Sequence, residues 1–218
     1  MKKQDPYCYP ETSVLKNKFN IREVSLLEKA EADLSRAKMS ILYESPVDKF
    51  DAQSFLRVHE FLFEEVYDWA GRLRTINISK PEEVLGGKSI WYEDALDLPE
   101  SLDRACTAIV DTVWHIRDKR RFCAQLAHVF APIWKVHPFR DGNGRASRML
   151  MNYQLMAAGF LPVSIAKEER LEYFETLEAY AVDGDLTPFA EMVASLEERR
   201  LDEYLILEQQ QGEIGHTL

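Results

Sequence analysis

The stretch HPFRDGNGRASR, residues 137–148, places one histidine, one acid, three arginines and two glycines around an asparagine. An apolar segment with helical periodicity, residues 122–136, precedes it, and a strong helix-forming run follows it to residue 158. We therefore predict a tight turn between two helices, with Gly142, Asn143 and Gly144 at the entry of the second helix.

The chemistry of this turn suits a chain of phosphates. Backbone N–H groups without a helical acceptor and the positive end of the helix dipole together attract anions. Glycine lets a phosphate approach the backbone closely because it has no Cβ. Arg145 and Arg148 lie three residues apart, so both guanidinium groups are predicted to lean over the same helix entry.

Two side chains beside the turn supply the rest of a group-transfer chemistry. Asp141 offers hard oxygen ligands that could hold Mg²⁺ between two phosphates. His137 lies at the end of the preceding helix, and a histidine side chain can accept a proton from a hydroxyl near neutral pH. Phe139 is predicted to anchor the loop in the core. A base, a metal ligand and a phosphate cradle in one loop indicate transfer of a phosphorus-containing group to a hydroxyl.

Outward from this loop, hydrophobic periodicity predicts a mostly α-helical chain with one small β-hairpin. Helical patterns cover residues 21–43, 55–69, 93–116, 122–136, 145–158, 166–182 and 188 onward. Apolar and polar residues alternate over residues 72–92 around a GGK turn, which predicts the hairpin. We expect an N-terminal arm over residues 1–20, one main domain over 21–200, and a C-terminal helical tail over 201–218.

Composition argues against several broad classes of function. The 218 residues carry a formal net charge of −10, which disfavours binding to nucleic acid or to anionic membranes. No run of eighteen apolar residues and no leader-like start are present, so we expect a cytoplasmic protein, although signal-free delivery into another cell would leave no trace. Three cysteines without CxxC spacing are predicted to be reduced structural thiols.

Other candidate motifs are weak. GGKS at residues 86–89 lacks the first glycine of a P-loop and precedes a strand, so it is predicted to be a turn. The remaining histidines have no metal-binding spacing and are predicted to be core or surface residues, and no zinc is expected. They are His59, His115, His128 and His216.

At the residues of the quoted stretch the sequence resembles the Fic (filamentation induced by cAMP) family, whose signature is HxFx(D/E)GNGRxxR. The matching positions are His137, Phe139, Asp141, Gly142, Asn143, Gly144, Arg145 and Arg148. DPYCYPETSVLKNK near the start and FEEVYDWAGRLRTINI before the hairpin also resemble bacterial Fic segments, so the similarity covers residues 5–194. The resemblance implies a Fic-fold helical bundle with a small β-hairpin flap.

The same resemblance implies a protein adenylyltransferase. In that reaction AMP moves from ATP, with Mg²⁺, to a Ser, Thr or Tyr hydroxyl of a target protein, and pyrophosphate leaves. His137 is then the general base and Asp141 the metal ligand. The flap, here about residues 80–92, aligns the target peptide by strand-like pairing.

The resemblance also assigns the phosphate contacts. Asn143, with the N–H groups of Gly142 and Gly144, holds the α-phosphate, while Arg145 contacts the phosphate chain and Arg148 the γ-phosphate. The kinase-like branch of the family carries lysine at the position of Gly144, so this glycine favours AMP transfer. Transfer of UMP, phosphocholine or phosphate stays open, as does a Fic-fold module that binds nucleotide without turnover.

Regulation is not decided by the sequence. Many Fic proteins are inhibited by a glutamate in the pattern (S/T)xxxE(G/N), which pairs with the second signature arginine, here Arg148. Residues 40–44, 164–168 and 187–191 each match all but the last position. The arm resembles the group in which a separate small antitoxin supplies the glutamate, so inhibition in trans and self-inhibition by Glu44 both stay open.

Overall fold

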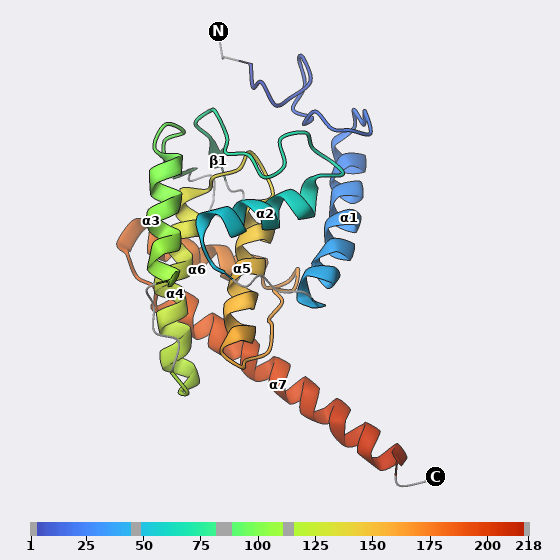
Figure 1. Cartoon of the computed structure of the whole chain (residues 1–218), viewed down its shortest axis with the longest axis vertical. Coiled ribbons are helices and arrows are strands. Elements are labelled where there is room, and N and C mark those ends of the chain that lie inside the picture. Colours follow the sequence, from blue (N-terminus) through green and yellow to red (C-terminus); the bar gives the residue numbers. More distant parts are fainter. Residues whose placement is uncertain (1–3, 45–48, 82–88, 111–115, 216–218) are drawn as a thin grey trace. The chain divides into compact units, whose positions relative to one another are not determined.

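The computed structural model describes residues 4–44, 49–81, 89–110 and 116–215 (Figure 1). Within these residues the chain forms seven helices and two short strands. The helices are α1 (Val24–Glu44), α2 (Ala52–Phe63), α3 (Leu98–Val110), α4 (Lys119–Val136), α5 (Asn143–Ala157), α6 (Arg170–Asp183) and α7 (Thr187–Gly215). The strands β1 (Ser79–Pro81) and β2 (Ser89–Trp91) pair antiparallel. The predicted mostly helical fold with a small hairpin is confirmed, while the GGK turn lies outside the described residues.

Two predicted helices differ most from the observed ones. The pattern over residues 55–69 predicted one long helix, but α2 ends at Phe63 and turns follow as far as Gly71. The apolar spacing continues through these turns because Val66 and Tyr67 are buried in them as well. The helix predicted from residue 93 begins at Leu98, because the chain before it is held in a turn by side-chain hydrogen bonds that compete with a helix.

The first structural unit contains residues 1–78, 92–110 and 136–150. In it α2 lies between α1 and α3 and packs against both (Figure 1). Asp51 caps α2 by accepting a hydrogen bond from the Ser54 N–H at 2.7 Å. Phe139 is fully buried, with its ring 5.4 Å from that of Phe55, as expected for the core anchor of the loop.

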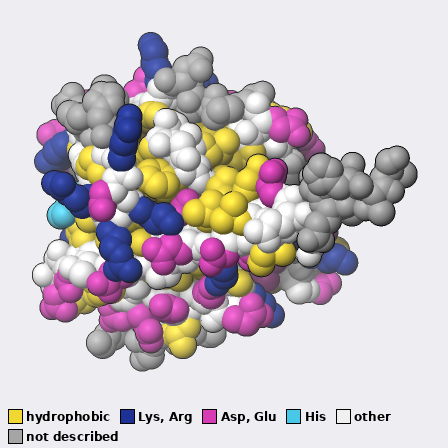
Figure 2. Space-filling view, turned by 90° about the horizontal axis from the view of Figure 1, so that it is seen from below, with side chains coloured by type: hydrophobic (Ala, Val, Ile, Leu, Met, Phe, Trp, Pro, Cys, Tyr) yellow, Lys and Arg dark blue, Asp and Glu magenta, His cyan; other side chains and the backbone are white. Residues whose placement is uncertain are grey.

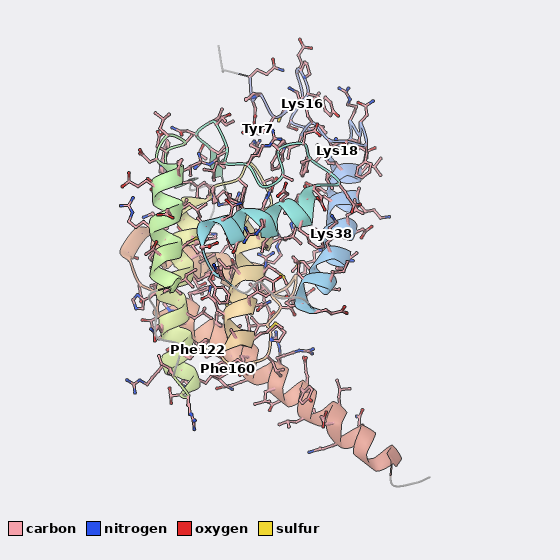
Figure 3. All side chains as sticks on the ribbon, in the orientation of Figure 1. Tyr7, Lys16, Lys18, Lys38, Phe122 and Phe160 are labelled. Atoms are coloured by element: carbon pink, nitrogen blue, oxygen red, sulfur yellow. The ribbon has the colours of Figure 1, made fainter. Side chains whose placement is uncertain are left out.

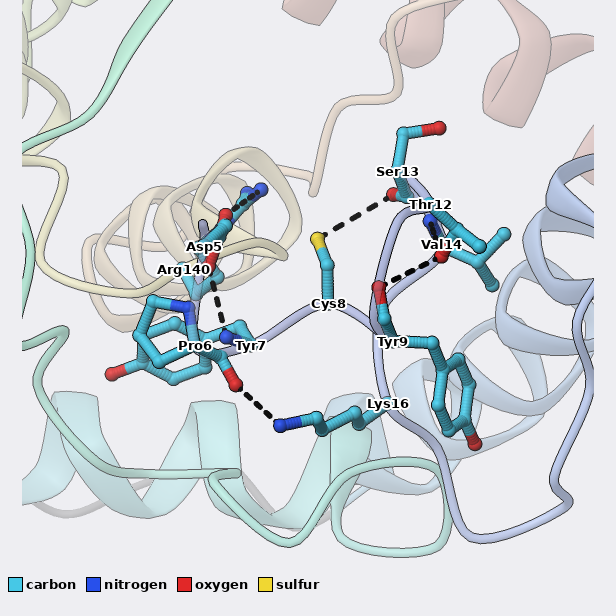
Figure 4. Close-up of polar contacts among 10 residues, drawn as sticks. All are labelled: Asp5, Pro6, Tyr7, Cys8, Tyr9, Thr12, Ser13, Val14, Lys16 and Arg140. Carbon is cyan, nitrogen blue, oxygen red and sulfur yellow. Dashed lines mark hydrogen bonds and ion pairs between the residues drawn. The ribbon is translucent and has the colours of Figure 1, made fainter. Parts of the chain in front are cut away.

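The N-terminal arm belongs to this unit although it contains no helix over residues 4–20. Figure 4 shows how its turns are closed: Tyr9 N–H donates to the Val14 carbonyl at 2.9 Å, and Lys16 donates to the Pro6 carbonyl at 2.8 Å. The same view shows Asp5 paired with Arg140, with 2.7 Å between Oδ2 and Nη2. The arm is therefore tied directly to the loop that carries the motif.

The second unit contains residues 79–91, 111–135 and 151–218. In it α6 packs against α7, and the rings of Phe122 and Phe160, labelled in Figure 3, lie 4.7 Å apart. Beyond residue 200, α7 carries apolar side chains that are 36–54% exposed. These side chains are Leu201, Tyr204, Leu205, Ile206 and Leu207.

Surface and thiol chemistry agree with the composition. On the face shown in Figure 2, acidic and basic side chains are interspersed, and they do not form one continuous positive area. No helix of the described residues combines the length and the apolar character that crossing a bilayer requires. The three cysteines are buried free thiols, and burial raises the pKa of Cys106 to about 12.

Candidate active site

The signature loop, residues 137–148, joins the end of α4 to the first turns of α5. His137 directly follows α4 with a φ of +48°, and Gly142 has a φ of +77°. The first position after a helix often adopts this left-handed conformation, although glycine is the usual residue there. Two left-handed residues thus bend the chain within the loop, as the turn prediction required.

Gly142 is enclosed on its α2 side. A Cβ at this position would lie 2.5 Å from the Phe63 ring and 2.9 Å from His59 Nε2, so no larger residue fits without movement. The Gly142 carbonyl accepts hydrogen bonds from the N–H groups of Arg145 and Ala146, both at 3.1 Å. The helix begins at Asn143, two residues before the predicted pattern at residue 145, and the N–H groups of its first two residues precede the first helical donor.

The side chain of Asn143 closes the loop on itself. Its Oδ1 accepts from the Phe139 N–H at 2.8 Å, and its Nδ2 donates to the Phe139 carbonyl, also at 2.8 Å. Asn143 is only 2% exposed. A phosphate contact by Asn143, as predicted, would therefore have to come from its backbone N–H.

The two predicted phosphate-binding arginines are placed differently. A Cβ on Gly144 would lie 3.1 Å from Nη1 of Arg148, so the Arg148 guanidinium lies directly against the helix entry. Arg145 is turned toward α1, where it pairs with the carboxylate of Glu31 and donates to the Ser35 hydroxyl at 3.0 Å. The Arg145 guanidinium also lies 4.6 Å from the centre of an aromatic ring of α2.

Glu31 joins a third group to this pair. The Tyr67 hydroxyl donates to its second carboxylate oxygen, and both residues are buried. Burial, together with the negative charge of Glu31, raises the pKa of Tyr67, so its hydroxyl stays protonated. In the structure, Glu31 of α1 thus pairs with the first signature arginine, Arg145. Glu44, the acid proposed for self-inhibition, is the exposed last residue of α1.

Asp141 is the single acid of the signature loop. Its Oδ1 accepts a hydrogen bond from the Gly142 N–H at 2.6 Å, which keeps the carboxylate beside the bend. Asp141 also lines a cavity of about 130 Å³ together with Arg140, Glu31 and Tyr67. A carboxylate bordering an open space at a helix N-terminus can hold a divalent cation.

His137 lies beneath an aromatic ring. It is 6% exposed, and the Tyr92 ring stacks on its imidazole with 3.7 Å between ring centroids. Tyr92 directly follows β2, so the residue next to the hairpin covers the predicted base. The backbone of His137 is fixed as well, because its carbonyl accepts a hydrogen bond from Nε of Arg74 at 2.9 Å.

His59 of α2 contacts the bend of the signature loop. The sequence predicted only that it is a core or surface residue. It is fully buried, stacks on Phe139 at 3.6 Å, and accepts from the Gly71 N–H through Nδ1 at 2.9 Å. Its proton must therefore lie on Nε2, which donates to the Asp141 carbonyl at 2.9 Å. Burial lowers the pKa of His59 to about 4, so the ring stays neutral.

Besides Asp5 of the arm, four residues outside the predicted set support the signature loop, three of them directly and Tyr67 through Glu31: Glu31, His59, Tyr67 and Arg74. Glu31 and His59 come from α1 and α2, Tyr67 from the turns that follow α2, and Arg74 from the irregular segment beyond those turns. Tyr67 and Arg74 lie in the FEEVYDWAGRLRTINI segment, whose resemblance to Fic proteins was the signal that could have pointed to them. For Glu31 and His59 a single sequence offers no comparable signal.

Comparison with known proteins places this loop in a family. Residues 49–155 match the Fic/DOC family. A protein adenylyltransferase of Bartonella henselae is 28% identical over 193 residues, which are 84% of this chain and 35% of that protein. A protein of Sinorhizobium fredii named "Probable protein adenylyltransferase y4lH" is 29% identical over 197 residues, 86% of this chain and 93% of that protein.

The fold has solved counterparts. The structure of BepC, a VirB-translocated effector of Bartonella tribocorum with bound AMPPNP, matches with a TM-score of 0.73 at 23% identity. The match covers 87% of this chain and 95% of that one. The chain spans about a third of the length of the B. henselae relative, so the similarity concerns one part of that longer protein. The matched segment, residues 49–155, contains the complete signature loop and belongs to the Fic/DOC family.

Proposed function

We propose that this protein is an adenylyltransferase that moves AMP from ATP to a Ser, Thr or Tyr hydroxyl of a target protein. The observation that carries the proposal is the signature loop, in which His137 and Arg148 flank a glycine bend at a helix N-terminus. The names of the relatives from B. henselae and S. fredii support AMP transfer. The AMPPNP bound to BepC supports a nucleotide triphosphate as the donor.

The proposed reaction uses residues of this loop for each step. His137 takes the proton of the acceptor hydroxyl, and the oxygen attacks the α-phosphorus of ATP. The bond from the α-phosphorus to the oxygen bridging to the β-phosphate breaks, and pyrophosphate leaves. The backbone N–H groups at the start of α5 and the Arg148 guanidinium stabilise the negative charge that develops. Arg145 contacts the phosphate chain once its pair with Glu31 opens.

Asp141 is the proposed ligand of Mg²⁺. Among the described residues no three His, Cys, Asp or Glu side chains form a cluster that could hold a metal ion by itself. Magnesium in nucleotide sites is usually held by one or two carboxylates together with substrate phosphates, so a single carboxylate suits an ion that arrives with ATP. Such an ion neutralises charge on the phosphates.

Two protein partners belong to the proposal. The hairpin around β1 and β2 would align the target peptide by strand-like pairing. A small antitoxin would supply a glutamate to Arg148 and so block productive placement of ATP. Glu44 is the alternative source of that glutamate, and Glu44→Gly tested with and without a co-expressed antitoxin separates the two.

The first test follows the radioactive label. Incubation of the purified protein and a bacterial lysate with α-labelled ATP and Mg²⁺ should label protein, whereas γ-labelled ATP should not. His137→Ala should lower the rate of labelling about 10²- to 10⁴-fold, because a general base is lost. Calorimetry should show unchanged affinity of the variant for ATP. Mass spectrometry of the labelled proteins then identifies the acceptor residues.

His128→Ala is the matched control, because His128 is an exposed histidine on α4 and should leave the rate unchanged. Labelling that survives in His137→Ala would remove the proposed base. Transfer of γ-label would indicate a kinase, and transfer from labelled UTP or CDP-choline a different group specificity. Tight ATP binding without any transfer would favour the nucleotide-binding module, which the coverage of His137 by Tyr92 makes the second candidate.

A further inference from the structure

Arg74 is a buried arginine whose guanidinium is surrounded by backbone carbonyls. It is 2% exposed and lies in the turn region after α2. Its Nε donates to the His137 carbonyl at 2.9 Å, Nη1 donates to the Ile76 carbonyl at 2.8 Å, and Nη2 donates to the Glu93 carbonyl. Its backbone N–H donates to the Pro138 carbonyl at 2.9 Å. Arg74 therefore joins its own segment to two other segments of the first unit.

The chemistry of this contact requires arginine. A buried positive charge must have its donors satisfied, and the carbonyl dipoles around Arg74 do this. The guanidinium presents five N–H donors in a rigid planar fork, so it can reach carbonyls in several directions at once. A lysine ammonium would keep the charge, but it has three donors on one atom and could not bridge the same segments.

The segments joined by Arg74 control the position of the proposed base. The carbonyl of His137 is held while its backbone is left-handed, with a φ of +48°, a conformation that few residues other than glycine adopt. Glu93 directly follows Tyr92, whose ring stacks on the His137 imidazole. Arg74 thus fixes the imidazole in two ways. It holds the backbone carbonyl of His137, and it holds the carbonyl of Glu93, the neighbour of the Tyr92 ring that covers the imidazole.

The same contact bridges the two ends of the hairpin segment. Ile76 precedes β1 along the chain and Glu93 follows β2. A second clasp reinforces this junction: Asn77 donates to the Asp94 carboxylate and accepts from the Ala95 N–H, both at 2.7 Å. Any change in the spacing of these two segments is therefore transmitted to the carbonyl of His137.

We propose that Arg74 is a positioning residue for the transfer reaction, which sets the orientation of the His137 imidazole toward the acceptor hydroxyl. The proposal rests on the proposed function. It assigns to Arg74 no contact with ATP or the target protein. Its loss should therefore lower the rate of the chemical step while the affinity for nucleotide stays the same.

The test is chemical rescue of Arg74→Ala. Misplacement of a reacting group by about 1 Å costs about 10²-fold in rate, so we expect kcat for α-label transfer to fall by about that factor. The dissociation constant for ATP should remain within about threefold of wild type, because binding energy that is common to ground and transition states is retained. Millimolar N-ethylguanidinium, which replaces the missing atoms, should restore the rate about tenfold, because the fork geometry matters more than the charge. It should do nothing for His137→Ala.

Arg72→Ala is the matched control. Arg72 lies two residues away in the same segment but is exposed. Its loss should leave the rate of label transfer unchanged, both with and without N-ethylguanidinium. Arg74→Lys replaces Arg74→Ala if the latter does not fold, and it should show the same loss of kcat with unchanged ATP affinity. Full activity in Arg74→Lys, or a loss of ATP affinity equal to the loss of rate, would overturn the proposal.

A second measurement keeps this proposal separate from the proposed function. Histidine ring signals in NMR spectra can be assigned with His137→Ala and His128→Ala. Arg74→Lys should shift the His137 ring signals and leave those of His128 in place, whether or not the wild-type protein transfers AMP. An unchanged His137 signal would overturn the positioning role even if the enzyme is active. If the wild type transfers no AMP but Arg74→Lys still shifts the His137 ring signals, the proposed function is refuted and the positioning role is retained.

Discussion

Two arginine–glutamate pairs in this molecule differ in their surroundings. In the first unit, Arg145 pairs with Glu31, which is 8% exposed and also accepts from a buried tyrosine hydroxyl. In the second unit, Arg199 pairs with Glu169, and their side chains are 50% and 20% exposed, against 22% and 10% for Arg145 and Glu31. A buried carboxylate depends on its partners for stabilisation, whereas an exposed one is hydrated and screened. The comparison predicts that the same deletion has very different consequences in the two units.

Glu31→Ala should produce the largest effect. It would leave the Arg145 guanidinium and the Tyr67 hydroxyl without their shared acceptor, and breaking a buried pair in this way costs about 3–5 kcal/mol. Urea unfolding monitored by circular dichroism measures the loss. Glu28→Ala, an exposed glutamate on the same helix, should change stability by less than about 0.5 kcal/mol. A loss below about 1 kcal/mol for Glu31→Ala would mean that the pair behaves like one at the surface.

His59→Gln tests how the first unit responds to acid. The pKa of His59 is about 4 in the folded protein, so between that value and the ordinary value near 6.5 the unfolded chain binds more protons. Stability should therefore fall as the pH drops through this window, by about 3 kcal/mol once the pH is below 4. Glutamine cannot take up this proton and can still bridge Gly71 and Asp141, so the variant should lose this part of the pH dependence.

The measurement is the free energy of unfolding as a function of pH for wild type and His59→Gln. His128→Gln changes an exposed histidine of the second unit and provides the control for the loss of an imidazole in general. Parallel curves for wild type and His59→Gln between pH 4 and 6.5 would show that His59 does not resist protonation in the folded state.

Glu169→Ala should produce the smallest effect. The hydrogen bond from Arg199 lowers the pKa of Glu169, but half of the Arg199 side chain and a fifth of the Glu169 side chain are exposed, so loss of the pair should cost less than about 1 kcal/mol. The cost should shrink further in 1 M NaCl, because salt screens exposed charges more than buried ones. Urea unfolding at low and high salt decides this. A loss as large as that of Glu31→Ala would erase the distinction between the two units.

The sequence predicted the parts of the site that depend on neighbouring residues. The start of α5 to within two residues, the bend at Gly142 and the place of His137 directly after a helix all follow from local spacing and turn chemistry. The hairpin strands were likewise visible in the alternation of residues 72–92. Local rules failed for the end of α2, because buried residues of the following turns continue its apolar spacing.

The supports of the loop could not be predicted in this way. Glu31 lies 114 positions from Arg145, His59 lies 82 positions from Asp141, and Arg74 lies 63 positions from His137. Contacts over such separations leave no periodic pattern in one sequence. The direction of Arg145 was unpredictable for the same reason, because a carboxylate in a distant helix decides where its guanidinium points.

The left-handed backbone of His137 has a consequence for engineering. A residue with a Cβ costs about 1–2 kcal/mol more than glycine in this conformation, so relaxing the main chain here means replacing the imidazole that we propose as the general base. Directed evolution that selects for thermal stability alone would favour glycine or asparagine at this position. Under the proposed function, such variants would be more stable but inactive. Thermostabilising campaigns on this scaffold should therefore screen turnover and melting temperature together.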